Sequence, residues 1–312
     1  MKKIFIMAIL SSLLIVNNIH SRIVFDYSAA ESVLEHFVDN QNNVKLILKN
    51  PAYQHILLHS QKYSSNPLTE ENLRNSLNGK KEGFDFLYVK ERKDKYIQII
   101  KYLKTNEQEI INIYAKFPLK YLPKDYNQKA TIYYIIGGYN GIAFDDKICI
   151  NIDYKQFREN YNEIKLYIAH ELFHLGFEKY QPLPNIFKAK TVKDLKKIVL
   201  YNTMNEGLAT LTPYHKRIEL NEIFDYDYKI LLDTIALNKK INQFDVVLAY
   251  LDKNKDKKLT NEILETVLGQ CSGDRLFYIV GCYMGLVIEG KYGTEEIRKL
   301  IKKKPEIFFS GV

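Results

Sequence analysis

The 312-residue sequence predicts a mainly α-helical α+β protein, with a helical N-terminal lobe, a small β-sheet, a helix that carries a candidate site and a helical C-terminal lobe. Helical periodicity runs from residue 27 to about residue 116 and returns near residue 159. Between these regions, two short runs rich in β-branched and aromatic residues predict strands. Hydrophobic residues make up 46% of the chain, which allows a sizeable core and argues against global disorder.

The first 21 residues predict a secretory signal peptide. Lys2 and Lys3 precede an apolar stretch at residues 4–16, and polar residues begin at Asn17. An apolar stretch of about 13 residues is short for a membrane span, which needs about 20. We therefore expect a secreted or cell-envelope protein, cleaved near Ser21. The alternative is an uncleaved segment that anchors the protein in the membrane.

Residues 22–129 predict the helical N-terminal lobe. Ser28 with Glu31 three residues later predicts a capping box. Asn50 before Pro51 is typical of a helix start, and Thr69 predicts another. The expected helices cover about residues 29–40, 50–60, a segment from 69 onward, and 93–117.

The second of these helices carries a pair of histidines, His55 and His59. Residues four apart share one helix face, so the pair can in principle hold a metal. However, Ile56 stands where a general base would be needed, and the interior of the segment is apolar. We therefore expect a structural role for this pair.

Residues 130–312 predict a catalytic region. Strands are expected at residues 131–136 and 148–152, separated by a glycine-rich turn. Further helices are expected at about 159–177, 192–212, 220–237, 244–250 and 275–289, and from residue 294. A proline-rich loop at residues 181–184 ends the first of them. The three cysteines, an odd number, give no disulfide framework.

The segment HELFH at residues 170–174 is the strongest functional signal. His170 and His174 leave the same helix face and can converge on one ion. Glu171, rotated by about 100° on the helix, is expected beside the ion, where a general base for a water molecule is needed. Zinc binds two such imidazoles and leaves further positions for a third protein ligand and a water.

Glu206, in the downstream segment NEGLA at residues 205–209, is the expected third ligand. The small residues Gly207 and Ala209 would allow its helix to approach the His-Glu helix closely. The competing interpretation is an ordinary surface glutamate.

These two segments together resemble the gluzincin zinc metallopeptidases and, more closely, exported bacterial zinc-dependent peptidases. The resemblance also covers residues 25–31, 50–53, 137–138 and 275–281. It implies a zincin-like fold for residues 130–312, Zn²⁺ as cofactor and a peptide or protein substrate. Two departures stand out: 31 residues separate His174 from Glu206, and Thr210 occupies the place of an acid that orients a histidine. Asn202, one turn before Glu206, is a candidate for that orienting role.

The function expected is hydrolysis of peptide bonds by a zinc-activated water, with Glu171 as general base and then as proton donor to the leaving amine. A donor to the tetrahedral oxyanion is also needed. The candidates are Tyr278, Tyr283, His215 and Arg275, and Tyr278 ranks first because it lies in a family-like segment. The strand at residues 131–136 is expected to accept an extended peptide by edge pairing.

Two alternatives remain open: a catalytically inactive binding protein of the same fold, and a metal-dependent hydrolase of a non-peptide amide or ester. The intact Glu171 favours an enzyme. The net charge of +8 comes from scattered lysines without any nucleic-acid-binding motif, so we expect a solvated surface and no nucleic-acid partner.

Overall fold

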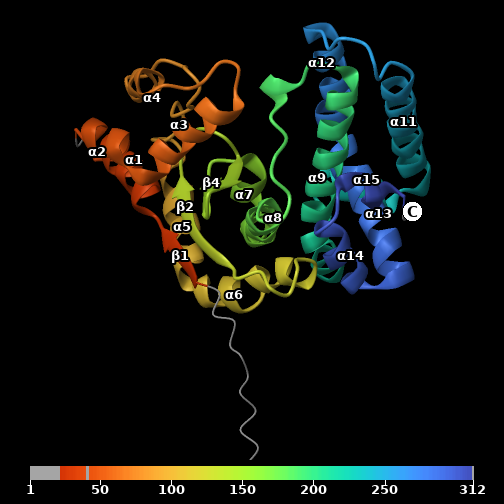
Figure 1. Cartoon of the computed structure of the whole chain (residues 1–312). Helices are drawn as coiled ribbons and strands as arrows, with labels where there is room; N and C mark the ends of the chain where they lie inside the picture. The colour runs from red at the N-terminus through yellow and green to blue at the C-terminus, as the bar shows by residue number, and fades with distance from the viewer. Residues whose placement is uncertain (1–21, 40–41, 311–312) are drawn as a thin grey trace, which may run out of the picture.

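The computed structural model describes residues 22–39 and 42–310 (Figure 1). The predicted signal peptide, residues 1–21, lies outside the described residues. The expected α+β class is confirmed, since helices dominate and surround one four-stranded sheet. No single helix in the described part is long and apolar enough to span a membrane. One pair, Asn261–Gly273 and Leu276–Tyr292, reaches that length only jointly and is bent by 56°.

The sheet has the strand order β1-β2-β4-β3. Its strands are β1 (Arg22–Asp26), β2 (Lys129–Ile135), β3 (Gly141–Phe144) and β4 (Lys147–Asn151). The strands β1, β2 and β4 are parallel, and β3 runs antiparallel to β4 at one edge.

Two expectations about the sheet are wrong. The N-terminal lobe begins with a strand, β1, which pairs in parallel with β2, so Asp26 lies opposite Tyr133. As a consequence β2, which covers residues 131–135 of the strand predicted at 131–136, is paired on both sides and cannot accept a peptide at its edge. The free edge beside the candidate site belongs to β3, where only four residues of strand follow the glycine-rich turn.

The N-terminal helices largely follow their predicted starts. They are α1 (Ser28–Val38), α2 (Val44–Lys49), α3 (Pro51–Tyr63), α4 (Glu70–Leu77), α5 (Lys93–Thr105) and α6 (Glu107–Asn112). Asn50 and Thr69 cap α3 and α4 through their side chains. The capping box expected at Ser28 does not form: Tyr27 is the N-cap, and the Ser28 hydroxyl accepts a hydrogen bond from Asn50 Nδ2 at 3.0 Å. The single helix expected over 93–117 breaks at Asn106.

The remaining helices follow the sheet. They are α7 (Lys155–Glu159), α8 (Asn162–Glu178), α9 (Val192–Leu220), α10 (Tyr226–Leu232), α11 (Thr234–Lys253), α12 (Asn261–Leu268), α13 (Leu276–Tyr292), α14 (Thr294–Ile301) and α15 (Pro305–Phe309). The helix α9 begins at a Thr191–Asp194 capping box and continues through Pro213. It is therefore longer than expected and ends at Leu220. The helix predicted over 220–237 does not form as one piece, because this stretch holds a loop at residues 221–225, then α10, a break at Asp233 and the start of α11.

Two hydrophobic cores meet at α8, which lies between the sheet and the C-terminal helices (Figure 1). Ile168 and Leu172 belong to the core of the N-terminal helices and sheet, whereas Phe173 and Phe177 belong to the core of α9–α15. A helix buried on several faces carries apolar residues all round, as α8 does. Residue 130, where we placed the start of the catalytic region, does not separate the cores, because the sheet packs with the N-terminal helices.

The contact between α9 and α13 depends on two glycines. A Cβ on Gly281 would lie 2.0 Å from the carbonyl oxygen of Thr203, and one on Gly207 would lie 2.3 Å from Gly281 Cα. Gly207 therefore allows α9 to approach α13. We had expected it to allow α9 to approach α8. The three cysteines are buried and unpaired, so Cys271 and Cys282 form no disulfide.

Candidate metal centre

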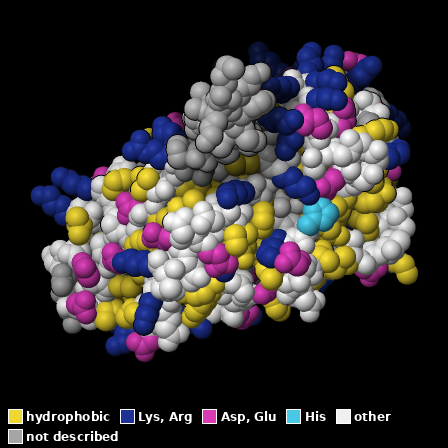
Figure 2. All heavy atoms as spheres, turned by 90° about the horizontal axis from the view of Figure 1, so that it is seen from below, with side chains coloured by type: hydrophobic (Ala, Val, Ile, Leu, Met, Phe, Trp, Pro, Cys, Tyr) yellow, Lys and Arg dark blue, Asp and Glu magenta, His cyan; other side chains and the backbone are white. Residues whose placement is uncertain are grey.

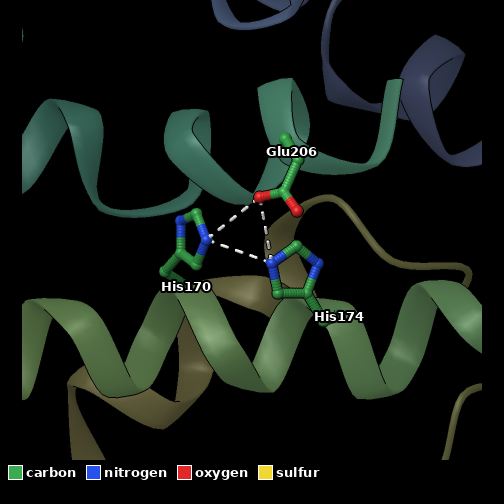
Figure 3. A group of neighbouring side chains, drawn as sticks. All are labelled: His170, His174 and Glu206. Atoms are coloured by element: carbon green, nitrogen blue, oxygen red, sulfur yellow. Dashed lines mark hydrogen bonds and ion pairs between the residues drawn. The ribbon is translucent and has the colours of Figure 1, made fainter. Parts of the chain in front are cut away.

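His170 and His174 lie on one face of α8, and both side chains point toward α9 (Figure 3). The fixed position of this helix comes from its burial between the two cores. Only 9% of His174 is exposed. The backbone that carries the imidazoles is thus held before any ligand binds.

Glu206 of α9 faces the two imidazoles across the gap between the helices (Figure 3). Its Oε2 lies 3.6 Å from His170 Nε2 and 3.4 Å from His174 Nε2, and the two nitrogens are 3.0 Å apart. Donor atoms placed 2.0–2.1 Å from a tetrahedral ion are about 3.3 Å from one another. The three atoms therefore already have the spacing of a zinc ligand set. In the described part of the chain, no other three His, Cys, Asp or Glu side chains bring their ligand atoms close enough together to hold an ion.

The orientation of His174 is set by Asn205. Its Nδ1 lies 2.9 Å from Asn205 Oδ1, and because that oxygen only accepts, Nδ1 carries the proton. Nε2 is then the nitrogen that can bind an ion, which is the usual arrangement for a metal-binding histidine. We expected Asn202 in this role. The rotation of α9 places Asn205 at the imidazole instead, while Asn202 lines the neighbouring cavity.

The electrostatics of the three groups favour a positive charge between them. Burial lowers the pKa of His174, but the Glu206 and Glu171 carboxylates and the hydrogen bond with Asn205 together outweigh it and raise the pKa to about 10. Burial raises the pKa of Glu206, but the two histidines hold it well below its ordinary value. A charged carboxylate facing two imidazole nitrogens is a donor set that suits a divalent cation.

Glu171 of α8 lies beside this centre, and its side chain approaches Gly141, the first residue of β3. Only 4% of it is exposed, and a Cβ on Gly141 would lie 2.8 Å from Glu171 Oε1. The hydroxyl of Tyr167, one helical turn earlier, also lies next to Gly141, at 2.9 Å from the same Cβ position, and so is near the Glu171 carboxylate. Our sequence interpretation did not include Tyr167, although its spacing of four residues before Glu171 places both on one face of α8.

Two of the four candidate oxyanion donors line the cavity at the metal centre, Tyr278 and Arg275. The ring of Tyr278 stacks on His170, with centroids 6.4 Å apart and planes 13° apart. The Glu206 carboxylate and burial both raise the pKa of Tyr278, which leaves its hydroxyl protonated as a donor. His215 pairs with Glu289 at 2.8 Å, and neither His215 nor Tyr283 lines the cavity.

The cavity has a volume of about 860 Å³ and follows α8 and α9, with the metal centre between its two ends. One end is bounded by aromatic and apolar side chains, including Tyr63, Leu183 and Phe187. The other end is bounded by charged and polar side chains, including Arg217 and Asp225. The loop between α8 and α9 contributes residues 182–187 to the first end.

Comparison with known families agrees with this geometry. Residues 34–310 match the family described as "Putative zinc dependent peptidase (DUF5700)". The chain belongs to this family. The match covers both lobes and the whole of the candidate site. No curated protein and no solved structure shows a significant match to the chain.

Proposed function

We propose that this DUF5700 member is an exported zinc-dependent peptidase of the gluzincin type, with a zincin-like catalytic region. The observation that carries the proposal is the spacing of His170, His174 and Glu206 at 3.0–3.6 Å with Glu171 at their side, inside a large cavity. A chain that only bound peptides would not need a buried carboxylate next to this donor set.

The residues have distinct roles in this proposal. His170, His174 and Glu206 hold the ion, and Asn205 fixes the tautomer of His174. When bound, zinc supplies Lewis-acid polarisation of a carbonyl group and makes water more acidic. Glu171 accepts the proton of the attacking water and returns it to the leaving amine. Tyr278 donates a hydrogen bond to the oxyanion that develops on the carbonyl.

The substrate proposed is a peptide in extended conformation along β3. Gly141, Ile142 and Ala143 line the cavity, and β3 has no strand on its outer side among the described residues. Its free backbone groups can therefore pair with a substrate strand. This replaces the edge pairing that we expected at residues 131–136.

Export is proposed from the sequence alone, from the basic and apolar pattern of residues 1–21. The surface is consistent with a solvated protein: on the face in Figure 2, Lys and Arg side chains are interspersed with Asp and Glu. We propose a secreted or cell-envelope location, with membrane contact only if the N-terminal segment is retained, and no nucleic-acid partner.

The test is hydrolysis of a mixed-sequence peptide library by the purified protein loaded with zinc, followed by mass spectrometry. We expect new amino termini that disappear after treatment with 1,10-phenanthroline and return when zinc is added. Glu171→Gln serves as the matched control, because it keeps the ligands and removes the base. A zinc-loaded, folded protein that cleaves no peptide would overturn the proposal.

A further inference from the structure

Tyr278 borders a large cavity and is only partly buried, so its phenol needs support to stay in one orientation. The ring has two contacts that can provide it. One is the parallel ring of His170, and the other is the guanidinium of Arg275, whose Cζ lies 3.3 Å from the ring centroid. This distance indicates close contact of a flat cation with the π face.

Arg275 is itself held by a carboxylate from another helix. Its Nε lies 3.0 and 3.1 Å from the two oxygens of Asp227 in α10, and Nη2 also bonds Asp227 Oδ2. The Asp227 side chain is only 3% exposed. Two parallel hydrogen bonds to one carboxylate fix the plane of a guanidinium, which a lysine ammonium cannot reproduce.

The backbone at Arg275 also adopts an uncommon conformation. Arg275 has φ +63° and ψ +23°, in the left-handed region that residues with a side chain avoid, and it follows a single π-helical turn, Gly269–Gly273. The turn is tied to α11, since Lys240 Nζ donates to the Asp274 carbonyl at 2.9 Å and Gln243 Nε2 to its carboxylate at 2.6 Å. Such conformations persist where several contacts enforce them, and they are enriched at functional sites.

We propose that Arg275, held by Asp227, is a positioning residue that fixes the phenol of Tyr278 toward the metal centre. The inference rests on the proposed peptidase function, because it assigns Arg275 a task in stabilising the oxyanion. Arg275 acts through Tyr278 and does not itself touch the substrate. The guanidinium gives two of its donor groups to Asp227 and its face to the phenol ring, which accounts for its orientation.

The kinetic test compares Arg275→Lys, Tyr278→Phe and the double variant, each with its zinc content measured. Tyr278→Phe is expected to lower kcat about 100-fold, as for loss of one oxyanion donor. Arg275→Lys is expected to lower kcat at least about 10-fold with little change in KM and with zinc retained. In the Tyr278→Phe background, Arg275→Lys should cost nothing more. If the double variant instead loses kcat by the product of the two single losses, the proposal is overturned.

A matched control is available on the N-terminal side. Arg92 pairs with Asp153 at 2.9 Å and lies 4.3 Å over the ring of Tyr88, outside the residues that line the cavity. Arg92→Lys removes the same kind of pair and should leave kcat unchanged. An equal loss of kcat in Arg92→Lys would mean that Arg275→Lys reports only general destabilisation.

A second measurement does not depend on turnover. With 3-fluorotyrosine in place of Tyr278 and zinc bound, we expect one sharp ¹⁹F resonance in the otherwise unchanged chain and in Arg92→Lys. Arg275→Lys should broaden or split it, because the ring then samples several orientations. An unchanged resonance in Arg275→Lys would contradict the positioning role even if the protein proved to hydrolyse no peptide.

Discussion

Two helices in the described part of the chain carry histidines four residues apart, and only one of these pairs faces a third side chain that could complete a metal site. In α8, His170 and His174 face a carboxylate from α9. In α3, His55 stacks on the ring of Phe144 from β3, with centroids 3.9 Å apart and planes 10° apart. The spacing of the histidines gives each pair a common face, but the element opposite that face decides what the pair can bind.

The opposing element also reverses the effect of burial on the imidazoles. Burial lowers the pKa of His55 and of His59 to about 4, and at His55 the Asp145 carboxylate offsets this effect only in part. At His174 the same effect of burial is outweighed by Glu206 together with Glu171 and Asn205, and the pKa rises to about 10. The α3 pair is therefore neutral and apolar in character, whereas the α8 pair lies beside a negative charge.

The largest effect of a substitution on kcat is expected at the residue after the first histidine. This residue is Glu171 in α8 and Ile56 in α3. Glu171→Gln should lower kcat by about 10²–10⁴-fold, the usual contribution of a general base, while one zinc stays bound. The measurement is steady-state hydrolysis of a peptide found in the library, normalised to zinc content. Unchanged turnover would remove Glu171 from the mechanism.

A smaller effect is expected from the residue that orients the imidazole. Asn205→Ala removes the acceptor for His174 Nδ1–H, whereas in the α3 pair His55 Nε2 and His59 Nδ1 have no hydrogen-bond partner. Loss of such a contact typically weakens metal binding by about 10–100-fold. Competition with a zinc-binding dye measures it. Asn202→Ala is the matched control on the same helix and should leave zinc affinity unchanged; the reverse pattern would restore our original assignment.

The smallest effect concerns stability at low pH. Because the folded-state pKa of His55 lies below its ordinary value near 6.5, protonation favours the unfolded state. The stabilisation present above pH 6.5 is therefore lost as the pH falls toward 4. Between pH 7 and pH 5, His55→Phe should lose less of its free energy of unfolding than the unmodified chain, by on the order of 1 kcal/mol. Urea unfolding at both pH values measures this, and equal losses would contradict the neutral, buried assignment.

Local features of the site could be predicted from the sequence, because they depend on neighbouring residues. The shared face of His170 and His174 follows from helix geometry alone, and Asn50 and Thr69 act as caps through adjacent backbone groups. Glu206 was predicted from the combination of two short segments. The structure brings its carboxylate to the two histidines.

Features that depend on distant pairing were missed. The strand β1 is five residues long, and its partner β2 begins after six helices, so no local pattern identifies the pair. Missing β1 also misplaced the sheet edge, which belongs to β3. The choice of Asn205 over Asn202 depends on how α9 is rotated against α8, and the Arg275–Asp227 pair joins α13 to α10. Tertiary packing sets both.

The central claim is that α8, and not α3, forms the metal centre. The direct measurement is zinc per chain by atomic emission, after removal of metal with a chelator and reloading with limiting zinc. We predict about one zinc per chain for the unmodified protein and for the double variant His55→Phe with His59→Phe. We predict none for His170→Phe with His174→Phe, with folding checked by circular dichroism. Zinc retained in that folded variant, or lost from the His55 and His59 variant, would contradict the account.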